Sequence, residues 1–232
     1  MPDGLTLILE TSTPHASVAT VRPGALVEQR EFSSDRSHNA VLFSPLKEVL
    51  DARGDLEIAL VIVGSGPGSY SGTRVGIAAA QGVAIASGCP AVALPSILAV
   101  PSAQGGASCL AIGDARRGSY WTAKVENFRM VAEPELTDTA GLEDIVRAAA
   151  SEGTAVFSFE DPARFPLSAD LVAQVKLEFP DARGLWNAWL AADGETRAKW
   201  SAEIPQPMYL KPPHITPAKH ASPIHAVGAR SS

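Results

Sequence analysis

A glycine-rich stretch from Gly64 to Gly76 is the part of the chain best suited to chemistry. It follows the apolar run Ala59–Val63 and leads into the small-residue segment Val75–Ser87. A loop of this kind, between a strand and a helix N-terminus, can turn backbone N–H groups toward an anion, because glycine tolerates positive φ and lets a ligand come close. An ordinary tight strand-to-helix connection explains the same glycines equally well. The candidate nucleotide or anion-binding residues are Gly66, Gly68, Ser69, Ser71, Gly72 and Arg74.

Familiar glycine motifs do not describe this stretch. No Lys follows its last glycine, as a Walker A loop requires, and its spacing is not G-x-G-x-x-G. Tyr70, not a serine, stands at the centre of Gly68–Gly72, so the stretch is not a nucleophile elbow. Arg74 stands at the start of the expected helix, where the macrodipole favours anions. A cation in this position either extends into solvent or faces an acid or a phosphate.

Two acids, Glu10 and Asp114, each end an apolar run. Such acids often serve as turn residues, and we favour that role over metal coordination. Two histidines, His15 and His38, are far apart, and three more lie in a proline-rich stretch at spacings that suit no rigid ligand set: His214, His220 and His225. We expect no metal site and no catalytic residue.

The elements that position these residues alternate between strands and helices. Predicted strands are Leu5–Leu9, Ala16–Val21, Leu26–Phe32, Ala59–Val63, Ala91–Leu94, Cys109–Asp114, Tyr120–Val125 and Ala155–Phe159. Predicted helices are Ala40–Leu50, Val75–Ser87 and Leu142–Ala150, and Ser102–Gly106 is a predicted linker. After this linker the strand, acid, turn and strand of the N-terminal half recur, which indicates an internal duplication.

Composition narrows the function further. The 232 residues are 46% hydrophobic and 19% charged, which predicts a globular α/β protein with a large core. The net charge of −6 argues against free-standing nucleic-acid binding, which needs clustered Lys and Arg. Two cysteines, Cys89 and Cys109, are expected to be reduced thiols of a cytoplasmic protein. We expect no secretory signal and no membrane segment, because the longest apolar helix candidate falls short of roughly 20 residues.

Read whole, the glycine-rich stretch resembles the signature of the TsaB family, the partner subunit of the bacterial tRNA threonylcarbamoyladenosine machinery. Other stretches are similar to family motifs: Ile8–Thr13, Ser37–Leu50, Asp114–Trp121 and Pro207–Lys211. The resemblance implies two ribonuclease-H-like lobes of the actin-like ATPase superfamily, with mixed sheets flanked by helices. We place the lobes at residues 1–101 and 107–211, followed by a Pro-rich tail, 212–232, that we expect to be disordered.

The resemblance also implies a function. The chain is expected to dimerise with a TsaD-type enzyme, in a complex that includes a TsaE-type ATPase, and to reach tRNA only through that complex. It supports threonylcarbamoyl transfer to the adenosine next to the anticodon and has no activity alone. No cofactor is expected to bind tightly, although ATP or ADP is expected at the joint interface; Glu10 and Asp114 are vestigial carboxylates. Alone, the chain is a candidate homodimer.

Small residues recur four apart on two rows of the segment Val75–Ser87, which suits close packing against a second helix. Burial inside the chain's own core explains the pattern equally well, and the resemblance favours the interface. The expected interface residues are Gly76, Ala78, Ala80, Gly82, Ala84, Ala86, Leu42 and Leu46.

Two other functions compete with the partner subunit. One is an actin-like kinase that uses ATP and magnesium, and the other is a glycoprotease-like peptidase. Against the kinase, this chain has Glu10 where such kinases usually have Asp. Against the peptidase, the chain has no nucleophile motif and no zinc ligand set.

Overall fold

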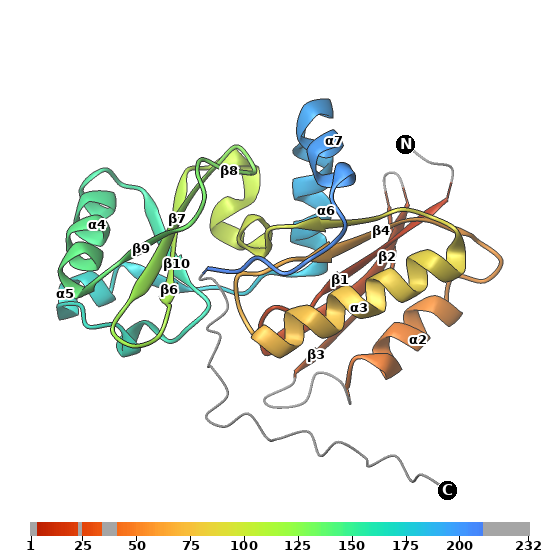
Figure 1. Ribbon diagram of the computed structural model, residues 1–232, viewed down its shortest axis with the longest axis horizontal. Helices are drawn as coiled ribbons and strands as arrows, with labels where there is room; N and C mark the ends of the chain where they lie inside the picture. The colour runs from red at the N-terminus through yellow and green to blue at the C-terminus, as the bar shows by residue number, and fades with distance from the viewer. Residues whose placement is uncertain (1–3, 23–24, 34–40, 211–232) are drawn as a thin grey trace, which may run out of the picture.

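The chain forms two β-sheets with helices packed around them. The computed structural model describes residues 4–22, 25–33 and 41–210. The predicted tail, His38 and the three later histidines therefore lie outside the described residues. Figure 1 shows the first sheet with α2 and α3 in front of it, and the second sheet beside it with α4 and α5 on its outer side.

The first sheet has the strand order β3-β2-β1-β4-β5. Its strands are β1 (Leu5–Glu10), β2 (His15–Arg22), β3 (Ala25–Ser33), β4 (Ile58–Gly64) and β5 (Ala91–Leu94). Within this sheet β1 runs antiparallel to β2 and parallel to β4, and β4 runs parallel to β5. Two helices connect these strands, α2 (Phe43–Asp51) and α3 (Tyr70–Ser87).

The second sheet repeats this plan. Its order is β11-β10-β6-β7-β8, with β9 also paired to β7. The strands are β6 (Cys109–Asp114), β7 (Tyr120–Glu126), β8 (Arg129–Met130), β9 (Glu135–Thr137), β10 (Ala155–Ser158) and β11 (Val175–Leu177). As β1 does with β2 and β4 in the first sheet, β6 pairs antiparallel to the next strand, β7, and parallel to a later strand, β10. The predicted duplication and the predicted fold class are confirmed.

The second lobe differs where the first carries its long helix. Between β10 and β11 lie only the 3₁₀ helix η3 (Pro162–Arg164) and the short helix α5 (Ala169–Val172). The helix α4 (Thr139–Ser151) covers this sheet and buries its own Leu142 and Val146 in the core between them. The first lobe therefore holds the fold's one glycine-rich strand-to-helix connection within the described residues.

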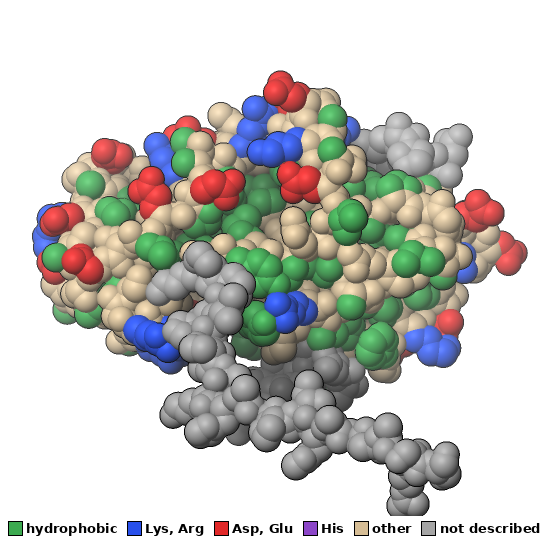
Figure 2. Space-filling view, in the orientation of Figure 1, with side chains coloured by type: hydrophobic (Ala, Val, Ile, Leu, Met, Phe, Trp, Pro, Cys, Tyr) green, Lys and Arg blue, Asp and Glu red, His purple; other side chains and the backbone are tan. Residues whose placement is uncertain are grey.

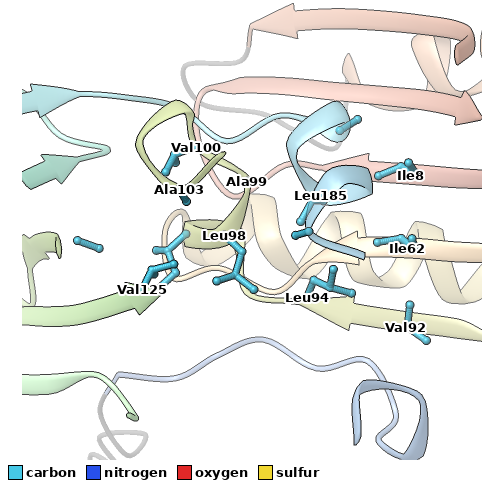
Figure 3. Close-up of a cluster of buried hydrophobic side chains, with 14 of the residues drawn as sticks. Ile8, Ile62, Val92, Leu94, Leu98, Ala99, Val100, Ala103, Val125 and Leu185 are labelled. Atoms are coloured by element: carbon cyan, nitrogen blue, oxygen red, sulfur yellow. The ribbon is translucent and has the colours of Figure 1, made fainter. Parts of the chain in front are cut away.

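Alternation of side chains along the strands builds two layers of core. In β1, Leu5, Leu7 and Leu9 face α2 and α3, whereas Ile8 faces the opposite side. That opposite side is covered by α6 (Ala182–Ala191) and by the 3₁₀ helix η1 (Ser96–Ala99) (Figure 3). Because residues of both sheets share this cluster, the two lobes are packed together through one continuous core.

Several predicted boundaries need correction. Residues Ser102–Gly106 are not an open linker but form η2 (Pro101–Gly106), where Ala103 is buried. Helix α3 begins at Tyr70 instead of Val75. The helices α6 and α7 (Gly194–Ala202) were not predicted. Although α6 lies within residues 107–211, it packs on the first sheet.

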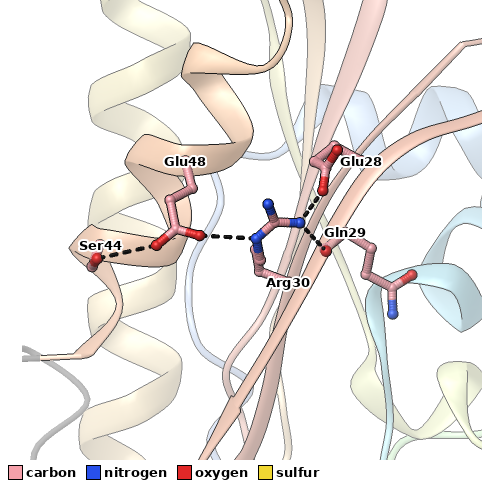
Figure 4. A network of polar contacts seen from close by, with 5 residues as sticks. All are labelled: Glu28, Gln29, Arg30, Ser44 and Glu48. Atoms are coloured by element: carbon pink, nitrogen blue, oxygen red, sulfur yellow. Dashed lines mark hydrogen bonds and ion pairs between the residues drawn. The ribbon is translucent and has the colours of Figure 1, made fainter.

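A surface network ties the edge strand β3 to α2. Arg30 donates to Glu48 on α2 at 2.8 Å and also pairs with Glu28 of its own strand (Figure 4). Ser44 donates to the other oxygen of Glu48 at 3.3 Å. Exposed ion pairs of this kind contribute little to stability, about 1 kcal/mol or less, so the apolar contacts of Leu46 and Val49 hold α2.

Candidate functional site

The glycine-rich connection is shorter than its sequence indicated. Ser69 is the N-cap of α3 and its hydroxyl accepts from the N–H of Gly72 at 3.2 Å. A serine here satisfies one of the four free amides of the first turn. Gly72 and Arg74 therefore lie inside the helix, and the loop itself spans residues 65–69. Ser71 is exposed in the first helical turn.

The amides expected to face an anion have acceptors within the chain. Gly66 N–H donates to the hydroxyl of Ser96 at 3.0 Å, and Ser69 N–H donates to the carbonyl of Ser12 at 2.6 Å. A β-carbon at Gly68 would lie 2.2 Å from that same carbonyl oxygen. The turn after β1 thus occupies the space in front of the loop. The amides of Gly66 and Ser69 are therefore already engaged within the chain.

Glu10 is completely buried behind this loop. One carboxyl oxygen accepts from Ser12 N–H at 2.7 Å, while the other, Oε2, is buried with no hydrogen-bond partner in the described structure. A β-carbon at Gly64 would lie 1.9 Å from Oε2, so the carboxyl lies directly against β4. Desolvation by burial raises the pKa of Glu10 and outweighs the hydrogen bonds from Ser12 and Ser96, which lower it.

This geometry gives Glu10 a structural role. A neutral carboxyl fits this site better than a charged carboxylate does, because the cost of burying the charge outweighs the hydrogen bonds from Ser12 and Ser96. By holding Ser12, the residue fixes the turn whose carbonyl in turn holds Ser69. The turn role favoured by the sequence is consistent with this, although the sequence did not indicate that the side chain is enclosed.

Asp114, the corresponding acid of the second lobe, lies at the surface of a cleft. It accepts from the backbone and the side chain of Arg116, at 2.6 and 3.1 Å, and its own N–H donates to Glu160 at 2.9 Å. The cleft, about 700 Å³, is lined by both lobes, including Ser12, Ser69 and Trp121. Of the two strand-end acids, Asp114 lines this cleft and Glu10 does not.

Among the residues that the structure describes, none of the ion pairs involves Arg74. Its guanidinium donates to the phenol oxygen of Tyr209 at 2.7 Å and lies 3.9 Å from the centre of the Tyr70 ring. The hydrogen bond to Tyr209 is the main reason that the pKa of Arg74 is raised. Arg74 therefore contacts two aromatic rings within the described structure, one of them 135 residues away in sequence.

The two small-residue rows of α3 have different environments. Three predicted interface residues, Gly76, Ala80 and Ala84, are buried against the first sheet, as are Leu42 and Leu46 of the α2 region. A β-carbon at Gly76 would lie 2.1 Å from the Thr11 hydroxyl. These five residues pack inside the chain and leave little surface for a partner, so their assignment to an interface stays a prediction.

The second row is open. Ala78, Gly82 and Ala86 are exposed, and Ile85 beside them is 82% exposed. A β-carbon at Gly82 would meet no atom within 4 Å. In Figure 2 this face of the molecule shows green hydrophobic side chains scattered over tan surface, with few charged side chains among them. The outer row is therefore the part of α3 available to another chain.

The structure also bears on the histidines, the cysteines and the membrane segments considered in the sequence. His15 stacks on Phe179, with 4.1 Å between the ring centres. In the described parts of the chain, no three His, Cys, Asp or Glu side chains are grouped so that they could hold a metal ion. Burial raises the pKa of Cys109 to about 12, which keeps it a thiol. None of the described helices combines the length and the apolar character needed to cross a membrane.

Comparisons with known proteins agree with this architecture. A family model described as "TsaD: tRNA N6-adenosine threonylcarbamoyltransferase" matches residues 31–182. An uncharacterized protein of Mycobacterium tuberculosis H37Rv is 30% identical over 180 residues, which are 73% of this chain and 83% of that protein. The tRNA threonylcarbamoyladenosine biosynthesis protein TsaB of Escherichia coli K12 is 30% identical over 122 residues, 50% of this chain and 52% of that protein.

Solved structures share the fold. A Pseudomonas aeruginosa protein described as similar to the peptidase YeaZ superposes with a TM-score of 0.65 and 22% identity, covering 90% of this chain and all of that chain. A second structure, YeaZ from the same organism, gives a TM-score of 0.61 with 22% identity, covering 89% of this chain and all of that chain. At this identity the likeness concerns the fold alone.

Proposed function

The chain belongs to the TsaB family, and we propose that it is a non-catalytic partner subunit in tRNA threonylcarbamoyladenosine biosynthesis, paired with a TsaD-type enzyme. It supports threonylcarbamoyl transfer to the adenosine beside the anticodon without carrying out the chemistry. A TsaE-type ATPase is a further member of the complex. The net charge of −6 fits a subunit that reaches tRNA through its partners.

The observation that carries this proposal is the open outer row of α3. Three small residues leave its backbone accessible, while Ile85 adds exposed apolar surface. Two helices with such faces pack at the short end of the usual 8–10 Å separation. Glycine within a helix lowers helix stability by roughly 1 kcal/mol relative to alanine, and close approach of a partner explains its presence at position 82.

Substitution on this row tests the proposal. We expect Gly82→Leu and Ala78→Leu to fold normally and to lower affinity for the TsaD-type enzyme at least tenfold, because a branched side chain keeps the partner helix away. Calorimetric titration measures the affinity, and circular dichroism checks the fold. Leu substituted for Ala148, on α4 of the other lobe and exposed, is the matched control. Unchanged affinity in both α3 variants would remove this helix from the interface.

A second test concerns catalysis. Because Glu10 is enclosed and the loop amides have internal acceptors, we expect the isolated chain to hydrolyse no ATP above background. Turnover of radiolabelled ATP with magnesium measures this directly, and Asp114→Ala is the diagnostic variant. Robust hydrolysis that disappears in Asp114→Ala would support the actin-like kinase reading instead.

A nucleotide bound between the two subunits needs phosphate donors other than these loop amides. The loop amides of Gly66 and Ser69 already have acceptors in this chain. Any ATP or ADP bound between the two subunits therefore takes its phosphate donors mainly from the partner.

A further inference from the structure

Arg74 is the one charged residue of α3, and two tyrosines hold it in place. The guanidinium carbon lies 3.9 Å from the centre of the Tyr70 ring and 5.6 Å from that of Tyr209. One of its nitrogens donates to the Tyr209 hydroxyl at 2.7 Å. Both rings are more than half exposed, so the group lies on the open face of the helix.

The ring of Tyr209 is itself anchored. It belongs to a C-terminal strap, residues 203–210, that runs along α3. The carbonyl of Pro205 accepts from the Gln81 side chain at 3.0 Å, and Met208 N–H donates to the Ser65 carbonyl at 2.8 Å. Because the strap is fixed at Pro205 and Met208, just before Tyr209, Arg74 is held in one geometry before any partner binds. Pre-organisation of this kind reduces the entropy lost on association.

The charge of Arg74 is not neutralised within the described structure. No ion pair to it occurs among the described residues, and α3 contains neither Asp nor Glu. Its neighbours along the outer row, Ala78 and Gly82, are uncharged. A partner that covers this row also covers the guanidinium, and a covered cation without a counter-charge is strongly unfavourable.

We infer that the partner packed on α3 presents a carboxylate side chain to Arg74, in the space between Tyr70 and Tyr209. This inference rests on the proposed function and adds the chemistry of the contact. Arg has a planar fork of N–H donors that matches a carboxylate in two parallel hydrogen bonds. Tyr and Arg are also the residue types that most often dominate binding energy at interfaces.

A second copy of this chain fits the same position poorly. Its α3 would bring another Arg74 and no acid. The acids of α2 are engaged, since Glu48 pairs with Arg30 and Asp51 pairs with Lys47. The charge pattern therefore favours a different protein, with an acidic residue on its contacting surface.

The test is a calorimetric titration of the TsaD-type enzyme into wild-type chain, Arg74→Gln and Arg74→Lys, each at low and high salt. We expect Arg74→Gln to weaken binding about tenfold and to reduce its dependence on salt. Arg74→Lys keeps the charge but loses the fork, so it should retain the salt dependence with intermediate affinity. Arg147→Gln, an exposed arginine on α4 paired with Glu143, is the control and should bind like wild type.

Each outcome has a definite meaning. If Arg74→Gln binds the enzyme with the same affinity and the same salt dependence as the wild-type chain, this inference is overturned and the proposed function stands. No binding by the wild-type chain overturns the proposed function and this inference together. Tyr209→Phe, which removes only the hydrogen bond to Arg74, covers the case in which Arg74→Gln does not fold, and it should weaken binding by a smaller factor. If Arg74→Gln instead dissociates a dimer of the isolated chain in light scattering, a second copy is the occupant and the inference fails.

Discussion

Replacing Gly68 by alanine is expected to lower the free energy of unfolding by about 3 kcal/mol, the upper end of what overpacking costs. The new β-carbon would lie 2.2 Å from the carbonyl oxygen of Ser12, a backbone atom that cannot rotate away. The same carbonyl accepts from Ser69 N–H, so moving it also breaks the bond that joins the turn to the loop. Urea unfolding followed by circular dichroism measures the change.

The matched control is Gly54→Ala. Gly54 also has positive φ, +59°, but a β-carbon there would meet no atom within 4 Å. Only the conformational penalty remains at this position, about 1 to 2 kcal/mol for an L-residue in the left-handed region. Equal losses in the two variants would show that the contact between the loop and the turn is unimportant.

Glu10 is expected to make stability depend on pH. Its pKa is raised in the folded chain, so the folded state binds the proton more tightly than the unfolded state. The contribution is fully present below the unfolded pKa of about 4.3 and is lost as pH rises through the folded pKa. Glu10→Gln cannot ionise, so its stability relative to wild type should improve steadily as pH rises above about 4.3.

Urea unfolding of both proteins from pH 4.5 to pH 8 tests this, with Glu133→Gln, at an exposed acid, as the control. A constant difference between wild type and Glu10→Gln over this range would show that Glu10 does not titrate with a raised pKa. Glu10→Ala should be less stable than Glu10→Gln by about 2 to 4 kcal/mol at every pH, because neither variant ionises at this position and in Glu10→Ala the Ser12 N–H loses its acceptor and a cavity forms.

Much of the fold could be predicted because its signals are local. Nearly continuous apolar runs define β1 and β4, and the acid and turn that recur at Asp114 reveal the duplicated plan. The start of α3 was misjudged because Ser69 looked like part of a loop, although serine is a favoured N-cap. A cap reading of that serine would have placed the helix correctly.

The site was less predictable because its contacts join distant parts of the chain. Glu10 is enclosed by β4 and η1, and Arg74 meets Tyr209 after 135 residues. Small residues recur four apart in both rows of α3, so the sequence predicts the same interface role for both rows. Only the packing of Gly76 against Thr11 separates the inner row from the open one. Tyr209 lies in a stretch that resembles a family motif, which was the available signal for its importance.

The most direct test of the central claim is the mass of the species formed when the purified chain is mixed with the TsaD-type enzyme of the same organism. Size-exclusion chromatography with light scattering measures it, and Gly82→Leu serves as the parallel sample. We predict one stoichiometric complex for the wild-type chain and separate components for Gly82→Leu. If the wild-type chain and the enzyme elute separately with the masses they have alone, at concentrations well above micromolar, the chain is not the partner subunit proposed here.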